Sequence, residues 1–363
     1  MRSLRLIAVL LLSQLLLACD QTTAVEHLAR AENYVQEADY RAAVIELKNA
    51  LQKDPDLMEA RAALGKAHLA LGDFASGVKE LERALALGSQ EEAVRLGLIS
   101  AKLGLGEYQA VLVELEGEAD LSPALKVLLA DAHLQAGQFE LAGGLYAETA
   151  DLAGAQLGLG TIAWVQGDVE QASQHLERSV ELDPSLREAW IRKAEFDLTQ
   201  RNFDSAEAAF QALSGLPGGE LTGRLGLART SLLLGDLVVA SEHIARFLAQ
   251  APGFTGGHYI DALIRHQQGD IDGAESALRE VQKTQPDHEP SLLLMGAVKL
   301  QQGQFGQAED NLRRYLARNR SSEAAAKLLA AVLHRQGDLA EVAALLSPYS
   351  SGTTDPQLLA MLG

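Results

Sequence analysis

The chain has 363 residues, of which 47% are hydrophobic and 22% charged, and this apolar content excludes a protein that is disordered throughout. Lys and Arg number 31 against 49 Asp and Glu, and the resulting net charge of −18 repels phosphate backbones and argues against a nucleic-acid partner. The only cysteine is Cys19, which excludes an intrachain disulfide and a cysteine cluster for zinc or iron–sulfur.

The N-terminal residues have the pattern of an export signal. Two arginines precede an apolar run from Leu6 to Ala18, which at about 13 residues is shorter than the roughly 20 that span a bilayer. The run ends in Leu16-Leu17-Ala18-Cys19, which resembles the lipobox of bacterial lipoproteins. The resemblance implies a signal peptide at 1–18, a lipidated tether at 19–23 and a membrane anchor on the cysteine. An ordinary secretory signal with an unrelated cysteine is the alternative.

The residue after Cys19 bears on the choice of membrane. Asp20 resembles the signal that retains lipoproteins of enteric bacteria in the inner membrane. The resemblance implies a periplasm-facing lipoprotein of a Gram-negative envelope, at the inner membrane, with the outer membrane as the alternative.

From residue 24 to residue 346 one short pattern recurs ten times. It is a turn residue, mostly glycine, followed by a polar and then an apolar residue, and seven of the nine steps between turn residues are 34 residues long. The ten turn residues are Ala38, Gly72, Gly106, Gly137, Gly167, Arg201, Gly235, Gly269, Gly303 and Gly337. Small or apolar residues lie about seven before and five after each turn residue, and a larger apolar residue often lies nine after it. The pattern predicts ten helical hairpins, each with a left-handed turn and a closely packed pair of helices, which stack because one hairpin cannot bury its apolar face alone.

This pattern resembles the tetratricopeptide repeat, and the second unit carries it in Leu64-Gly65, Gly72-Asp73-Phe74, Gly77, Leu81 and Ala84. The resemblance implies an all-α fold, a right-handed solenoid of tetratricopeptide helical hairpins in which the first helix of each unit lines the concave face. The third and fourth units are shorter than the rest. We expect the shortening to fall on helix ends or on the loops near Gly117 and Leu121.

The C-terminal residues 347–363 predict the start of an incomplete eleventh repeat. Asp355-Pro356 is typical of a helix start, and Leu362-Gly363 matches Leu64-Gly65 of the second unit. We therefore expect a truncated chain or a short relative of a longer array. A short apolar helix that caps the last groove is the alternative.

No motif predicts an enzyme, a cofactor or a metal site. The nine histidines show no metal-ligand spacing, and we expect His68, His133, His258 and His266 to lie in the core or line a groove. The segment Gly158–Ala163 fits a dinucleotide pattern, but no strand precedes it and its glycines stand where the repeat needs small residues. We predict a non-enzymatic protein without a cofactor.

Stepping by one period along the predicted first helices selects a mostly apolar stripe. Together with two positions one turn earlier, it gives a candidate partner groove of Leu69, Trp164, Leu198, Leu225, Leu232, Tyr259, His266 and Leu300. An apolar groove in an acidic protein favours a peptide or helical segment of a partner protein. The alternative is that these side chains pack against neighbouring units.

The first two units resemble a narrower family. Residues 42–55, Glu59-Ala60-Arg61 and Leu64-Gly65-Lys66 are similar to the tetratricopeptide-repeat lipoproteins of the PEP-CTERM/exosortase system. That resemblance implies a lipid-anchored scaffold that supports exopolysaccharide assembly or export linked to PEP-CTERM protein sorting. A generic periplasmic assembly factor for outer-membrane or pilus proteins is the alternative.

Overall fold

The structure is a computed structural model that describes residues 22–350. Within this range the chain forms twenty helices and no strand, which confirms the predicted all-α class. The predictions on Cys19 and Asp20 lie outside the described residues, as does most of the predicted eleventh repeat at 347–363, of which only residues 347–350 are described, at the end of the last helix. The chain divides into two compact units between Lys193 and Ala194, and each unit is described by itself.

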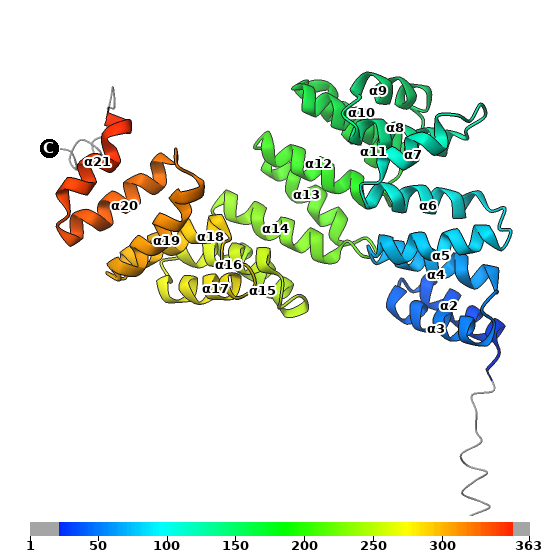
Figure 1. Cartoon of the computed structure of the whole chain (residues 1–363), viewed down its shortest axis with the longest axis horizontal. Helices are drawn as coiled ribbons and strands as arrows, with labels where there is room; N and C mark the ends of the chain where they lie inside the picture. Colours follow the sequence, from blue (N-terminus) through cyan, green and yellow to red (C-terminus); the bar gives the residue numbers. More distant parts are fainter. Residues whose placement is uncertain (1–21, 351–363) are drawn as a thin grey trace, which may run out of the picture. The chain divides into compact units, whose positions relative to one another are not determined.

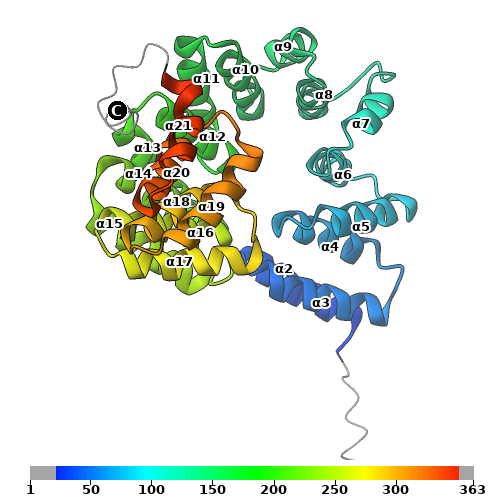
Figure 2. The ribbon, with the colours of Figure 1, turned by 60° about the vertical axis from the view of Figure 1, so that its left-hand side comes forward.

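The first unit is a succession of hairpins, each of which pairs a first helix with a second helix (Figure 1). The pairs are α2 (Ala24–Gln36) with α3 (Tyr40–Lys53), α4 (Met58–Ala70) with α5 (Phe74–Ala86), α6 (Glu92–Gly104) with α7 (Tyr108–Leu115), α8 (Pro123–Gln135) with α9 (Phe139–Glu148), and α10 (Ala153–Gln166) with α11 (Val169–Leu182). Figure 2 shows these hairpins following one another from α2 to α11. The boundary between the units falls inside α12 (Arg187–Thr199).

The second unit continues the same pattern from α13 (Phe203–Ser214). Its complete hairpins are α14 (Glu220–Leu234) with α15 (Leu237–Gln250), α16 (Thr255–Gln267) with α17 (Ile271–Thr284), α18 (Glu289–Gln301) with α19 (Phe305–Arg318), and α20 (Glu323–Gln336) with α21 (Leu339–Ser350). No helix within residues 22–350 is both long and apolar enough to cross a membrane.

The turn between the helices of a hairpin depends on the recurring turn residue. All ten turn residues have a positive φ, from 57° at Ala38 to 88° at Gly337. Only Ala38 and Arg201 adopt this left-handed conformation with a side chain, which strains the backbone. The polar residue that follows often caps the second helix, as Asp73 does by accepting a hydrogen bond from the Ser76 N–H at 3.1 Å. The sequence pattern therefore indicates a left-handed turn followed by the N-cap of the second helix.

The close approach of the helices needs small residues at the contact. A Cβ added to Gly65 would lie 2.5 Å from Leu81 Cγ, so the side chain nine residues after the turn residue fills the space that the glycine leaves. Leu81 is fully buried, as is the corresponding Leu47 of the first hairpin. These contacts form the core of the stack.

The two short repeats are shortened in their second helices. Helix α7 has 8 residues and α9 has 10, whereas α3 and α11 have 14 each. Leu115 at the end of α7 and Tyr146 in α9 are still fully buried. The shortening therefore removes the helix beyond the packing residue and keeps the core contact.

The first helices of successive hairpins also contact one another. In the first unit α4 contacts α6, α6 contacts α8 and α8 contacts α10; in the second unit α14 contacts α16, α16 contacts α18 and α18 contacts α20. The first helices therefore line one face of each unit, which we call its inner face.

Candidate functional site

The inner face of the first unit is hollowed by two adjoining cavities, which together we call the inner groove. The first has a volume of about 340 Å³ and lies among α4, α6, α8 and the start of α10, with Leu69 at one end. The second has a volume of about 440 Å³ and lies among α6, α8, α10 and α12. Ser100 and Leu128 line both cavities, so the groove is continuous along the first helices.

The second cavity holds a carboxyl–hydroxyl pair in which the pKa of both groups is raised. Asp131 on α8 lines the cavity, and the buried Tyr146 on α9 donates a hydrogen bond from its hydroxyl to Asp131 Oδ1 at 2.5 Å. Burial raises the pKa of Asp131 to about 6, although the hydrogen bond from Tyr146 opposes the shift. Burial and the charge of Asp131 also raise the pKa of Tyr146, so its hydroxyl stays a proton donor. Burial thus disfavours the charged form of the Asp131 carboxyl.

Tyr146 reaches Asp131 because of a glycine on the next first helix. The ring of Tyr146 lies where a side chain on Gly158 of α10 would be, so any Cβ at that position would clash with it. Tyr146 stands nine residues after Gly137, at the position that is leucine in most other hairpins. The same packing position therefore carries a hydroxyl to the inner groove.

Two other polar side chains of the second cavity form hydrogen bonds close to their own positions in the sequence. Arg192 donates a hydrogen bond to Glu188 Oε1 at 3.2 Å, one turn away on α12. The Thr161 hydroxyl donates to the Leu157 carbonyl at 2.8 Å. No charged side chain contributes to the shifted pKa of Asp131.

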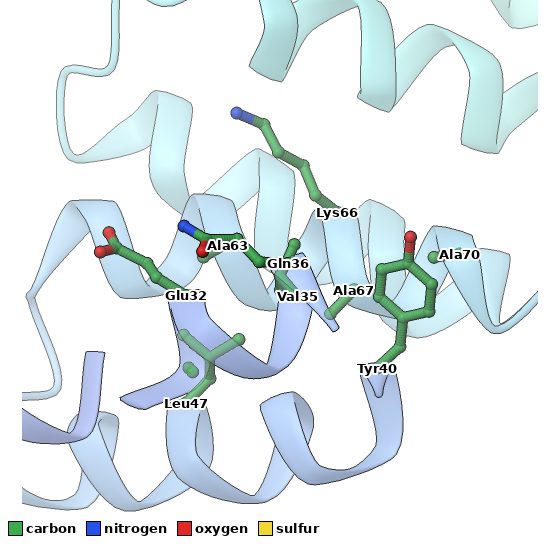
Figure 3. A pocket seen from close by; sticks show the side chains of 10 residues that line it. Glu32, Val35, Gln36, Tyr40, Leu47, Ala63, Lys66, Ala67 and Ala70 are labelled. Atoms are coloured by element: carbon green, nitrogen blue, oxygen red, sulfur yellow. The ribbon is translucent and has the colours of Figure 1, made fainter. Parts of the chain in front are cut away.

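A separate cavity of about 490 Å³ lies between α2 and α4 at the first hairpin (Figure 3). Its apolar lining includes Val35, Leu47 and Ala67, and Figure 3 shows Glu32 and Lys66 contributed from the two first helices. Lys66 Nζ also forms an ion pair with Glu91 Oε2 at 3.1 Å. This cavity offers an apolar hollow with a charge of each sign beside it.

The eight residues predicted for the partner groove fall into two groups. Leu198 and Leu232 are only 6% and 8% exposed, so they offer a partner little surface. The others are half-buried: Leu69, Trp164, Leu225, Tyr259, His266 and Leu300.

Several of the half-buried residues pack against the core of their own unit. Leu69 packs beside Leu81 in the first unit and also lines the inner groove. In the second unit Leu225 packs against the cluster around Ile244, and Leu300 against the cluster around Leu333. A role in partner binding stays a prediction for these side chains.

Asp131 and Tyr146 were not predicted from the sequence as site residues. A tyrosine where most hairpins carry leucine was a visible sign, because a buried hydroxyl needs a partner. Asp131 stands six residues before its turn residue, where Ser100 and Thr161 stand in the adjacent hairpins. Only the fold shows that it meets the tyrosine.

Two buried histidines have a structural role. His68 Nδ1 lies 3.0 Å from Asp73 Oδ2, and His133 Nδ1 lies 2.6 Å from Gln138 Oε1. In both cases the partner is the polar residue that follows the turn residue, so the histidine ties the first helix to the turn. Among residues 22–350 no three His, Cys, Asp or Glu side chains are grouped to hold a metal ion.

The segment Gly158–Ala163 lies in the middle of α10 rather than in a loop after a strand. Gly158 faces Tyr146, and a Cβ on Gly160 would lie 2.9 Å from Leu176 Cγ. These glycines therefore serve helix packing, in agreement with their place in the repeat.

Comparison with known proteins supports the repeat assignment along the chain. A tetratricopeptide-repeat family model matches residues 28–92 and 157–220, and a second model of this repeat matches residues 265–332. No curated protein matches the sequence.

Two solved structures show the same fold at low identity. One is the crystal structure of the APC/C hetero-tetramer Cut9-Hcn1, with a TM-score of 0.52 and 11% identity over 92% of this chain and 94% of that chain. The other is PilW, a widely conserved type IV pilus biogenesis factor, with a TM-score of 0.52 and 17% identity over 58% of this chain and 98% of that chain. At these identities the likeness concerns the fold alone.

Proposed function

Because the chain belongs to the tetratricopeptide-repeat family, we propose that it is a non-enzymatic scaffold that binds a segment of a protein partner in the inner groove of its first unit. The observation that carries the proposal is the pair of adjoining cavities that share Ser100 and Leu128. Their combined lining is largely aliphatic, from Leu69 and Leu96 to Leu134 and Leu157. Such a groove suits the apolar side chains of a helical or extended segment.

Site-specific photocrosslinking in cells tests the binding role. A photoreactive amino acid at Ser100 sits where the two cavities meet, and the same amino acid at the exposed Glu82 on the second helix α5 is the matched control. We expect a discrete crosslinked protein from position 100 and none from position 82. Crosslinks of equal yield at both positions, or none at position 100, would contradict binding in the groove.

The proposed location is the bacterial envelope, with the protein held at a membrane by a lipid on Cys19. The support is the apolar run before Cys19 and its resemblance to a lipobox, and Asp20 favours the inner membrane. A Cys19→Ala variant is expected to move from the membrane fraction to the soluble periplasm, because two or three acyl chains are what makes anchoring stable. A variant that stays in the membrane fraction would contradict the lipid anchor.

The proposed process is exopolysaccharide assembly or export linked to PEP-CTERM protein sorting, which rests on the resemblance of the first two units. A deletion strain is expected to lose secreted polysaccharide and to regain it when the 363-residue chain is supplied. Unchanged polysaccharide would contradict this process.

The alternative is an assembly factor for outer-membrane or pilus proteins, which the fold shared with a type IV pilus biogenesis factor makes worth testing. Pilus fibres and outer-membrane protein levels are measured in the same deletion strain. Their loss with intact polysaccharide would favour the alternative.

A further inference from the structure

The inner groove contains a carboxylate that the chain itself does not neutralise. Asp131 Oδ1 accepts the Tyr146 hydroxyl, and no cation of the described residues forms an ion pair with Asp131. The nearby Arg192 already forms an ion pair with Glu188 at 3.2 Å. The cavity around Asp131 is also lined by four leucines, among them Leu103 and Leu128, and by uncharged polar side chains such as Gln135.

We propose that the second cavity of the inner groove binds a basic side chain of the partner, an arginine or lysine flanked by apolar residues, with Asp131 as its counter-ion and Tyr146 as the positioning residue. The proposal rests on the proposed function, because it names the chemistry of the segment that the groove holds. A half-buried carboxylate without a cation is unfavourable, and a docked guanidinium or ammonium group supplies the missing charge.

The geometry favours a single basic residue rather than a basic tract. Asp131 is flanked on the adjacent first helices by Ser100 and Thr161, which stand at the same repeat position and carry no charge. The hydrogen bond from Tyr146 fixes one carboxylate oxygen and leaves the other for the ligand. A net charge of −18 also steers basic segments toward the protein.

Binding should depend on pH, since a docked cation needs the ionised carboxylate. The charged or titratable side chains that line this cavity besides Asp131 are Glu188 and Arg192 on α12, and Tyr146 on α9 reaches the carboxylate. The lining residues of α6 and α10 are uncharged. With the pKa of Asp131 near 6, affinity is expected to fall by up to about tenfold from pH 7.5 to pH 5.0.

The test is a selection of twelve-residue peptides, displayed on phage, against the full chain at pH 7.5. Three proteins are compared: the wild type, Asp131→Asn, and Glu82→Gln, a control with the same change of charge on an exposed side chain outside the inner groove. The amide in Asp131→Asn keeps an acceptor for the Tyr146 hydroxyl, and circular dichroism checks that both variants are folded. We expect one basic residue between apolar residues in the peptides that the wild type selects.

The selected peptide is then synthesised with a fluorescent label, both unchanged and with citrulline or norleucine in place of its arginine or lysine. We expect the neutral replacement to weaken binding at least tenfold to the wild type and to Glu82→Gln, and to have little effect on binding to Asp131→Asn. The two peptides are compared on the same protein, so the loss of affinity expected for the wild type does not depend on how a variant folds.

Three outcomes would overturn the inference. Selected peptides without a basic residue would show that the groove does not recognise a cation. An equal loss of affinity in Asp131→Asn and Glu82→Gln would show a general effect of net charge. The absence of any selected peptide would contradict the proposed function as well, whereas the first two outcomes leave groove binding intact.

Discussion

The free energy of unfolding of an Asp131→Asn variant minus that of the wild type should be larger at neutral pH than at acid pH. Burial raises the pKa of Asp131 from 3.8 to about 6. Between these values the folded state binds more protons than the unfolded state, so this carboxyl lowers the free energy of unfolding as pH rises through the window. The loss is complete above about pH 7. Asparagine has no such titration.

The size of the effect follows from the shift. One pKa unit corresponds to about 1.4 kcal/mol, so the ionised carboxyl lowers the free energy of unfolding by about 3 kcal/mol at pH 7 and by roughly half of that at pH 5. The stability of Asp131→Asn minus that of the wild type should therefore rise by about 1.4 kcal/mol from pH 5 to pH 7.

Urea unfolding, monitored by tryptophan fluorescence, measures this difference in the part of the chain that surrounds Asp131. The two tryptophans, Trp164 and Trp190, lie on α10 and α12, whose residues also line the cavity with Asp131. Asp151→Asn, which changes an exposed carboxyl, is the control, and its difference from the wild type should not vary between the two pH values. A difference for Asp131→Asn that is constant or falls with pH would refute the raised pKa of Asp131.

Three further predictions concern the packing of the hairpins, each measured by urea unfolding. Gly158→Ala should lower the stability by about 1–3 kcal/mol because its Cβ clashes with the Tyr146 ring, and adding Tyr146→Leu should recover part of the loss; additive effects would refute the contact. Ala38→Gly should be neutral or stabilise by up to about 1 kcal/mol, because it removes strain at a φ of 57°, and clear destabilisation would contradict that strain. Lys299→Met should lower the free energy of unfolding by about 3 kcal/mol, because it removes the cation that lies 2.5 Å from Glu275 in a buried ion pair. A loss below about 1 kcal/mol would show that the pair is solvated.

The sequence predicted the hairpins because their requirements are local and recur. A left-handed turn, a cap and a small residue at a close contact each restrict one position to a few residue types, and ten repetitions made the pattern visible. Even the departures were meaningful: Ala38 and Arg201 occupy the same left-handed position as the eight glycines. The short steps likewise correspond to the shortened α7 and α9.

The site was less predictable because a periodic position does not say how much of a side chain the next hairpin covers. Leu198 and Leu232 belong to the same predicted stripe as Leu69, yet they are nearly covered while Leu69 is half-buried and lines the inner groove. Coverage depends on the size of neighbouring side chains and on the gap between successive first helices. Both depend on how three helices pack together, and the spacing of residues along the sequence does not predict that packing.

The contact between Tyr146 and Gly158 suggests how a recognition site can arise in such an array without disturbing it. The packing residue nine positions after the turn meets the next first helix, and Phe210, another aromatic at that position, also faces a glycine, Gly226. Where the packing residue is Leu115, the next first helix instead brings Leu128 to the same cluster. The fold thus constrains the combined volume of the two side chains, so a tyrosine is admitted wherever the facing residue is glycine. Because the tyrosine hydroxyl extends beyond the length of a leucine, it reaches the inner face, where it can hold a carboxylate that the repeat pattern neither requires nor predicts.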